Sequence, residues 1–147
     1  MPDQSPRLSV RAVIMRAGRL LIVNAYPGDR SDLWCAPGGG VERHASLADN
    51  LIREVAEETG LTITPGRLLG TSEFHDPAHD YHQVELFYAA TAEGEVRVDD
   101  PEGVVNRHLW VDEVALRALR FKPDFLPRLA FGQPGEVLHD PLERIMP

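Results

Sequence analysis

Three glutamates near the middle of the chain, Glu54, Glu57 and Glu58, have a spacing that suits metal chemistry. At positions i, i+3 and i+4 of a helix, their carboxylates project from one side. Carboxylates this close repel one another, and a hard divalent cation with oxygen ligands would relieve the repulsion. Mg²⁺ is the first candidate, with Mn²⁺ as a substitute. The alternative interpretation is a solvated surface, because glutamate-rich helix faces are common.

A run of glycines, Gly38, Gly39 and Gly40, comes shortly before these glutamates. Glycine lets the backbone approach an anion closely and leaves carbonyl oxygens accessible to a metal ion. With Glu42 just behind it, the run is a candidate substrate and phosphate loop. A glycine run by itself is more often a simple turn, so the combined spacing with the glutamates carries the prediction.

The combined pattern resembles the sequence box of the Nudix hydrolase family. That box runs Gly, five residues, Glu, seven residues, then Arg-Glu-apolar-x-Glu-Glu-x-Gly-apolar. The matching positions are Gly39, Arg53, Glu54, Val55, Glu57, Glu58, Gly60 and Leu61, and Glu42 falls at a frequent acidic position of the loop. The looser pattern of strands around the box extends the resemblance over residues 8 to about 130.

One position departs from the box, because Ala45 stands where its first glutamate should be. In the family that glutamate is thought to support the arginine and the metal shell. Glu42 or Glu57 could take over the pairing with Arg53. Members often have glycine at the position of His44; if φ there is still positive, His44 costs on the order of 1 kcal/mol.

The resemblance implies hydrolysis of a pyrophosphate bond in a nucleoside diphosphate linked to another moiety, such as a nucleoside triphosphate, an NDP-sugar or ADP-ribose. Glu54, Glu57 and Glu58 would hold Mg²⁺ with the help of a carbonyl near Gly38 or Gly39. The alternative, which Ala45 motivates, is a catalytically weakened Nudix domain that binds nucleotides or regulates.

The resemblance also gives roles to catalytic residues. Arg53 would orient a glutamate rather than touch the substrate. One carboxylate must accept a proton from the attacking water. Glu54 is a candidate by its box position, while Glu85 and Glu102 are candidates outside the box.

Hydrophobic periodicity predicts the elements that must position these residues. Ser46 to Thr59 has helical spacing, with Ser46 as its cap and Gly60 just past its end. The other predicted elements are a hairpin over 8–25, strands over 33–36, 62–73, 82–92 and 108–111, a turn over 99–102, and short helices over 112–119 and 123–131. This pattern indicates an α/β protein, and the resemblance implies an α/β/α sandwich with a mixed sheet between helices.

The expected organisation is a flexible arm over 1–7, one Nudix domain over 8–135 and a C-terminal tail over 136–147. The segment FHDPAHDYH, with His75, Asp76 and His79, is expected at the mouth of the pocket. Tyr26 and Tyr81 are among the aromatic residues that could stack on a base.

Composition excludes other classes of protein. The 147 residues carry a formal net charge of −8, which argues against nucleic-acid coating, and no apolar run is long enough for a membrane span. A single cysteine, Cys35, excludes an intrachain disulfide and favours the cytoplasm; it is expected to be packed and inert. The expected partner is a small nucleotide, with the protein a monomer or homodimer.

Overall fold

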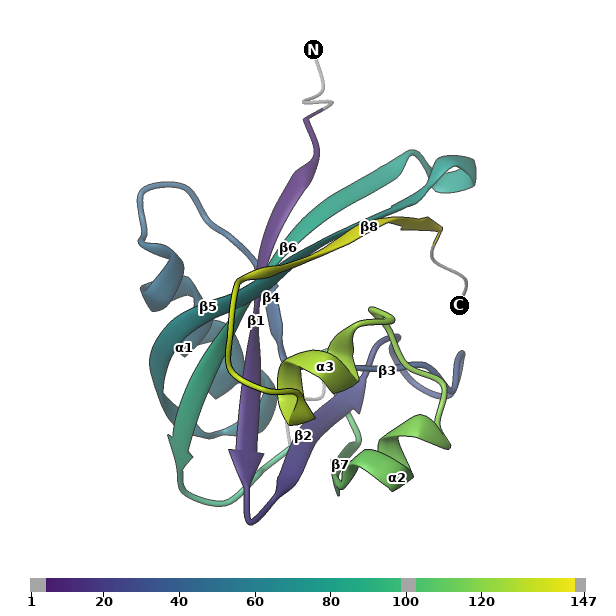
Figure 1. The fold of residues 1–147 in the computed structure, drawn as a ribbon. Helices are drawn as coiled ribbons and strands as arrows, with labels where there is room; N and C mark the ends of the chain where they lie inside the picture. Colours follow the sequence, from purple (N-terminus) through teal and green to yellow (C-terminus); the bar gives the residue numbers. More distant parts are fainter. Residues whose placement is uncertain (1–4, 99–102, 145–147) are drawn as a thin grey trace.

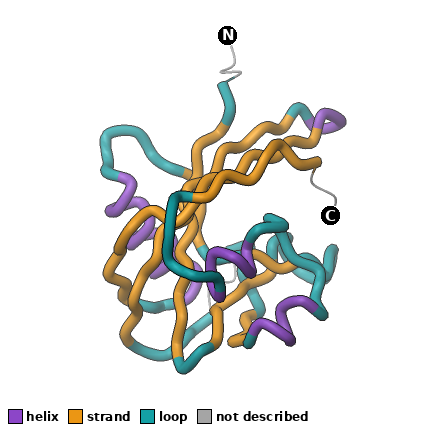
Figure 2. The backbone as a smooth tube through the Cα atoms, in the orientation of Figure 1, coloured by secondary structure: helices purple, strands orange, loops and turns teal. Residues whose placement is uncertain are grey.

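A mixed sheet with helices on both faces forms the structure, which is a computed structural model that describes residues 5–98 and 103–144 (Figures 1 and 2). The elements are β1 (Arg7–Arg16), β2 (Arg19–Asn24), β3 (Trp34–Cys35), β4 (Gly38–Gly40), α1 (Leu47–Thr59), β5 (Thr62–Asp76), the 3-10 turn η1 (Pro77–His79), β6 (Tyr81–Glu93), β7 (His108–Val111), α2 (Glu113–Arg117), α3 (Leu126–Phe131) and β8 (Leu138–Arg144).

The strand order is β3-β2-β1-β6-β5-β8, with β4 also paired to β1 and β7 to β2. Two neighbouring pairs, β1–β6 and β5–β8, are parallel, and the other pairs are antiparallel. The register between β1 and β6 places Ser9 opposite Glu85 and Arg11 opposite Phe87. A mixed sheet between helices confirms the predicted α/β/α architecture.

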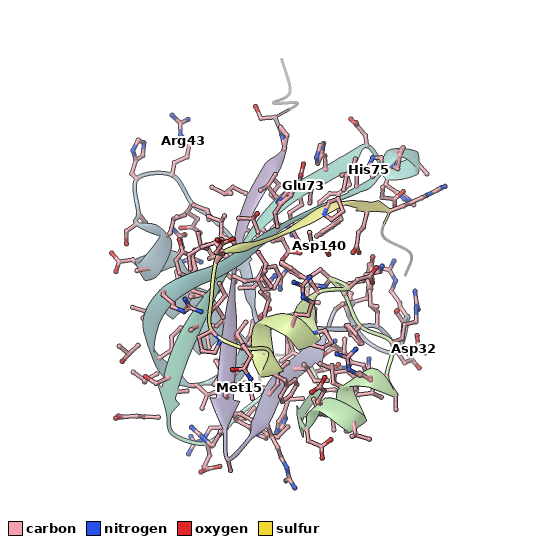
Figure 3. All side chains as sticks on the ribbon, in the orientation of Figure 1. Met15, Asp32, Arg43, Glu73, His75 and Asp140 are labelled. Atoms are coloured by element: carbon pink, nitrogen blue, oxygen red, sulfur yellow. The ribbon has the colours of Figure 1, made fainter. Side chains whose placement is uncertain are left out.

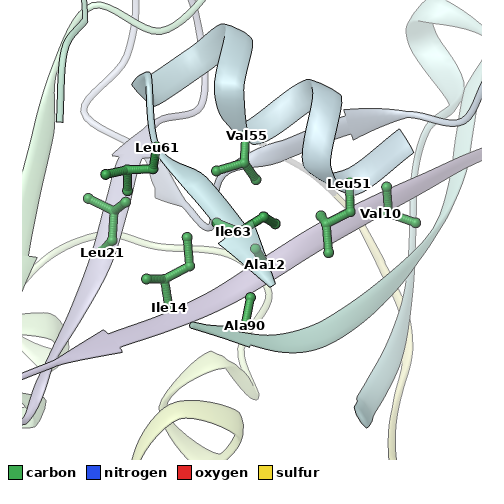
Figure 4. Packing of buried hydrophobic residues seen from close by; sticks show 9 residues of the cluster. All are labelled: Val10, Ala12, Ile14, Leu21, Leu51, Val55, Leu61, Ile63 and Ala90. Carbon is green, nitrogen blue, oxygen red and sulfur yellow. The ribbon is translucent and has the colours of Figure 1, made fainter. Parts of the chain in front are cut away.

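Helix α1 begins and ends as the sequence predicts. Ser46 Oγ accepts a hydrogen bond from Asp49 N at 3.0 Å, and Gly60 closes the helix with φ of 73°. The apolar side of α1 packs onto one face of the sheet (Figure 4). The buried residues of this core are Val10, Ala12, Ile14, Leu21, Leu51, Val55, Leu61, Ile63 and Ala90.

Helices α2 and α3 cover the opposite face of the sheet, over a second core that includes Val13, Phe87 and Leu126. Side chains alternate between the two faces along a strand. Because Val10 and Ala12 of β1 face α1, Ser9 and Arg11 face the other side. This alternation places polar side chains of β1 and β6 on the α2/α3 side of the sheet.

Two segments differ from the predicted elements. Arg7 already belongs to β1, and residues 138–144, predicted as part of a tail, form β8 in parallel register with β5. Pro141 suggests irregular structure, but proline is tolerated on an edge strand because its missing N–H removes no ladder bond. The predicted turn over 99–102 lies outside the described residues. No helix in the described part of the chain is long and apolar enough to cross a bilayer.

Candidate functional site

A cavity of about 500 Å³ lies where the glycine strand β4 meets the polar side chains of β1 and β6. Glu54 and Glu58 of α1 both line it, together with all three glycines of β4. The other polar and aromatic residues of its lining, with Cys35, are Arg7, Arg11, Asn24, Tyr26, Arg30, Cys35, Phe74, Asp76, His79, Tyr81, Gln83, Glu85 and Lys122. The structure therefore brings together most of the residues that the sequence singles out.

The glycines of β4 explain how a helix on one face of the sheet reaches this cavity. A side chain at Gly39 would overlap the carboxylate of Glu54, and one at Gly38 would overlap the backbone of β1 at Val10 and Arg11. Gly38 also has a φ of 154°, which residues with a side chain rarely adopt. Bare backbone at these positions lets the carboxylates of α1 pass beside the strand.

Glu58 is the most constrained of the three box glutamates. Its Oε1 accepts a hydrogen bond from Gly38 N at 2.8 Å. Burial raises the pKa of the Glu58 carboxyl to about 7, although the charge of Arg11 and this backbone hydrogen bond act to lower it. A buried carboxyl of this kind gains from an additional positive charge.

Glu57 is not among the residues that line the cavity. Its side chain is 56% exposed, and Oε1 lies 3.8 Å from Arg53 Nη1. The assignment of Glu57 as a metal ligand stays a prediction, because it requires the carboxylate to turn away from Arg53.

A buried ion pair joins β1 to β6 at the floor of the cavity. Arg11 Nε lies 2.5 Å from Oε2 of Glu85, and both side chains are largely buried. Burial disfavours the charged guanidinium, but the nearby Glu85 raises the pKa of Arg11 above its ordinary value. Arg11 Nη1 also donates to the carbonyl oxygens of Ala36 and Gly38, at 3.1 and 3.4 Å. Glu85 is therefore in the site, with its carboxylate already engaged.

A row of hydrogen bonds continues from this pair along the floor. Ser9 Oγ donates to Glu85 Oε2 at 3.4 Å and accepts from Gln83 Nε2 at 3.2 Å. The hydroxyl of Tyr81 donates to Gln83 Oε1 and accepts from Arg7 Nη1. The buried polar side chains of Ser9 and Gln83 thus have partners, and the floor is held rigidly.

Aromatic and charged side chains surround the mouth of the cavity. The guanidinium of Arg30 lies 5.7 Å from the ring centroid of Tyr26, and the rings of Phe74 and Tyr81 are 5.9 Å apart. His79 Nδ1 lies 2.7 Å from Asp76 Oδ2. Of the segment FHDPAHDYH, residues Phe74, Asp76, His79 and Tyr81 line the cavity, whereas His75, Asp80 and His82 do not.

Cys35 also borders the cavity, but its thiol is not activated. Burial raises the pKa of Cys35 to about 12, despite the charge of Arg11 nearby. The thiolate required for nucleophilic chemistry is therefore not populated near neutral pH.

Arg53 lies at the outer edge of the site, on α1. Its Nη1 is 3.0 Å from Glu54 Oε1, and 3.6 Å from Glu42 Oε1. Its Nη2 donates to Oδ1 of Asn50 at 2.7 Å. Sequence analysis did not select Asn50, although i, i+3 spacing on the helix brings it beside Arg53. Glu102, a candidate base, lies outside the described residues.

A second, larger cavity of about 660 Å³ lies between the irregular part of β5 and α3. It is lined mainly by apolar residues such as Val13 and Leu129, and none of the predicted site residues borders it. The smaller cavity is the candidate active site because the carboxylates and the glycine strand meet there.

Comparison with known proteins decides the family. The sequence model of the NUDIX domain matches residues 5–129, which covers most of the chain. The chain belongs to the Nudix family. The match ends before β8.

Among curated relatives, the Putative ADP-ribose pyrophosphatase YjhB of Bacillus subtilis (strain 168) is 32% identical over 90 residues, covering 59% of this chain and 42% of that protein. Human diphosphoinositol polyphosphate phosphohydrolase 3-alpha is 40% identical over 125 residues, covering 80% of this chain and 72% of that protein. The chain spans between 42% and 62% of the length of the first three such relatives.

Solved structures agree with this fold. The MutT NUDIX hydrolase from Burkholderia pseudomallei has a TM-score of 0.67 and 29% identity, covering 75% of this chain and 85% of that one. A NUDIX hydrolase from Nitrosomonas europaea has a TM-score of 0.70 and 21% identity, covering 85% and 86%. These similarities agree with the sandwich seen here.

Nudix proteins generally use a divalent metal, and the donor chemistry of this site fits one. Glu54 and Glu58 supply carboxylate oxygens beside the accessible backbone of β4, and the burial of Glu58 favours a compensating cation. Among the described residues, no three His, Cys, Asp or Glu side chains already converge as a complete ligand set. That is compatible with Mg²⁺, which is commonly held by one or two carboxylates together with water and substrate phosphates.

Proposed function

We propose that this Nudix protein is a Mg²⁺-dependent pyrophosphohydrolase that cleaves a nucleoside diphosphate linked to another moiety. The observation that carries the proposal is the convergence of Glu54 and Glu58 on the glycine strand β4 inside the cavity. Mn²⁺ would substitute for Mg²⁺. We place this activity in the cytoplasm, on a small dissolved substrate, with the protein acting as a monomer or homodimer.

In this proposal Glu54, Glu57 and Glu58 hold the metal, and Gly38–Gly40 and Glu42 border the bound phosphates. For Glu57 this requires exchange of a weak, exposed pairing with Arg53 for a metal bond. When bound, the metal would offset phosphate charge and lower the pKa of the attacking water.

The general base must be a carboxylate able to accept a proton from that water. Glu85 is a poor choice, because its carboxylate is already held by Arg11 at 2.5 Å. Glu54 borders the cavity, and its contact with Arg53 at 3.0 Å is longer than that of Glu85 with Arg11, so we propose Glu54 as the proton acceptor. Glu102 remains a second candidate. Arg53 then serves to orient Glu54 rather than to bind substrate.

The charges around the cavity favour a nucleotide over a polyphosphorylated inositol. Three of its basic side chains, Arg11, Lys122 and His79, already face carboxylates at 2.5, 2.9 and 2.7 Å. A polyphosphorylated ring requires many cations, whereas a base needs a planar surface such as Tyr26 or Tyr81. We therefore expect the nucleoside to lie at the aromatic mouth and the pyrophosphate beside β4.

The test is a screen of the purified protein with Mg²⁺ or Mn²⁺ against nucleoside triphosphates, NDP-sugars, ADP-ribose, dinucleoside polyphosphates and a diphosphoinositol polyphosphate. We expect at least one nucleotide to be hydrolysed, with a kcat/KM at least tenfold above that for the inositol compound. Because Ala45 removes a box glutamate, the competing function is nucleotide binding with little catalysis. Nucleotides that raise the melting temperature without being hydrolysed would establish that alternative instead.

A further inference from the structure

Asn50 is a buried polar residue whose side chain has every hydrogen-bonding position occupied. It lies in the first turn of α1 with 0% of its surface exposed. Its Oδ1 accepts hydrogen bonds from Glu42 N at 2.8 Å and from Arg53 Nη2 at 2.7 Å. Its Nδ2 donates to the carbonyl oxygens of Ser46, Ala45 and Glu42, at 2.8, 3.2 and 3.5 Å.

These bonds fasten the loop over residues 41–46 to the start of α1. The loop projects beyond the helix, with Arg43 near its tip (Figure 3). His44 within it has a φ of 71°, a strained conformation for a residue with a side chain. Asn50 therefore supplies contacts that hold the loop in a shape the backbone would not choose alone.

The same side chain fixes the direction of Arg53. Asn50 Oδ1 is closer to the guanidinium than Glu42, at 3.6 Å, or Glu57, at 3.8 Å. Those two carboxylates are 72% and 56% exposed, so their pairing with Arg53 is screened by water. With Nη2 held by Asn50, Nη1 points at Oε1 of Glu54, 3.0 Å away.

Ala45 contributes to this arrangement through its backbone alone. Its methyl group offers Arg53 no acceptor, and its carbonyl oxygen accepts from Asn50. The buried amide thus links the loop, the arginine and the carboxylate of Glu54 that borders the cavity. The N-cap of α1 is Ser46, so the bonds of Asn50 to the loop and to Arg53 go beyond capping the helix.

We propose that Asn50 is a positioning residue that, through Arg53, orients Glu54 for metal binding and proton transfer in place of a carboxylate at position 45. The role of Glu54 in this statement rests on the proposed function. Asn50 itself touches neither substrate nor metal. Its contribution lies in limiting the directions that Arg53 and the loop can adopt.

The first test compares Asn50→Ala with Asp112→Ala. Asp112 caps α2 by accepting from Ala115 N at 2.8 Å, and it does not border the candidate site in the described structure. Both variants should lower the melting temperature. We expect Asn50→Ala also to weaken Mn²⁺ binding at least tenfold, measured by electron paramagnetic resonance, and to lower kcat at least tenfold with KM changed less than threefold. Asp112→Ala should change neither Mn²⁺ binding nor kcat.

Asn50→Asp separates positioning from stability. The aspartate keeps an oxygen facing Arg53 but loses the amide donor to the loop carbonyls. Its melting temperature should therefore fall as far as that of Asn50→Ala, while Mn²⁺ affinity should fall at least threefold less. If Mn²⁺ affinity instead follows the melting temperature across the three variants, Asn50 acts on stability alone and the proposal is wrong.

A measurement without substitution of Asn50 covers the case in which its variants do not fold. In the wild-type protein, the side-chain amide protons of Asn50 should exchange slowly with water by NMR, and Arg53→Gln should shift their resonance. Rapid exchange and no shift would overturn the proposal. If the wild-type protein hydrolyses nothing, the proposed function is wrong. The Mn²⁺ and NMR measurements still test whether Asn50 positions Arg53 and Glu54.

Discussion

Glu58 and the Arg11–Glu85 pair beside it show how single residues prepare this site. The carboxylate of Glu85 pairs with Arg11, and Glu58 accepts one backbone hydrogen bond in a buried position. Burial raises the pKa of Glu58, although the charge of Arg11 and this hydrogen bond act to lower it. A metal ion would supply the positive charge that the protein leaves out, and the glutamates of α1 are the residues on which this idea can be tested.

Replacement of each box glutamate by glutamine removes a charge with little change of shape. We expect Glu54→Gln, Glu57→Gln and Glu58→Gln each to reduce turnover by at least about 10²-fold, the scale seen when one electrostatic element of an active site is lost. Mn²⁺ affinity should fall in parallel. Glu113→Gln, on the exposed start of α2, is the matched control. A Glu57 variant with full activity would remove that residue from the metal site.

The raised pKa of Glu58 predicts a pH-dependent difference in stability. In the presence of a chelator, the contribution of protonated Glu58 to folding is fully present below its ordinary pKa of 4.5 and is lost as the pH rises through about 7. Glu58→Gln should match the wild type at low pH and exceed it above pH 7, by at most roughly 3 kcal/mol. Urea denaturation across this range measures the difference. A constant difference at all pH values would contradict the assigned pKa.

At the scale of elements, strand β4 lies between α1 and the cavity, and its glycines are needed for different reasons. An added Cβ at Gly39 meets the movable carboxylate of Glu54, whereas at Gly38 it meets fixed backbone of β1. We therefore expect Gly39→Ala to cut turnover at least tenfold with a melting temperature within about 3 °C of the wild type. Gly38→Ala should instead destabilise the fold by roughly 2–4 kcal/mol. Thermal unfolding and kinetics of both variants distinguish these reasons, and equal effects would contradict the assignment.

Elements with strong local signals could be predicted from sequence. The Ser46 cap, the apolar stripe through Leu51 and Val55, and Gly60 mark the ends and the buried side of α1. Strand β8 could not be predicted, because Pro141 and the exposed polar residues around it have no clear alternation, and its pairing with β5 is a tertiary effect. Local pattern defines elements best where it coincides with burial.

The candidate site, too, could be predicted from the sequence only in part. Spacing along α1 and the glycines of β4 selects residues that the fold brings to one cavity. The engagement of Glu85 by Arg11 depends on contacts across strands, and the bond from Glu42 N to Asn50 depends on how the 41–46 loop folds back on α1. No spacing rule gives the partner of a side chain that is 74 residues away, as Arg11 is from Glu85.

At the scale of the whole molecule, the two faces of the sheet carry different features. One face carries the apolar core beneath α1, and the other carries the second core and, beyond it, the polar floor of the cavity. The parallel pair β1–β6 supplies Arg7, Arg11, Gln83 and Glu85 to the cavity, and the buried Ser9 bonds Gln83 and Glu85 behind it. The polar floor therefore lies on central strands, where neighbours on both sides hold it, whereas the box glutamates reach the cavity from α1.

Strand β8 lies at the edge of this sheet and beyond the matched Nudix domain. None of its described residues borders the cavity, although Glu143 lies 2.9 Å from Lys122 and Leu138 packs on the second core. Removal of residues 137–147 should therefore cost stability rather than catalysis. We expect a loss of roughly 2–4 kcal/mol, which lowers the melting temperature by about 5–15 °C, while kcat stays within about threefold below that temperature.

Glu143→Gln is the matched control for this truncation. It removes the ion pair with Lys122 but leaves the pairing of β5 with β8 in place. It should lower the melting temperature by less than half as much. Lys122 also borders the cavity, and Asp124, 2.9 Å from its Nζ, stays as its partner when Glu143 is replaced. A truncated protein that keeps its melting temperature but loses turnover at least tenfold would show that β8 acts on the site. If Glu143→Gln reproduced that loss, Lys122 would be the residue through which β8 acts.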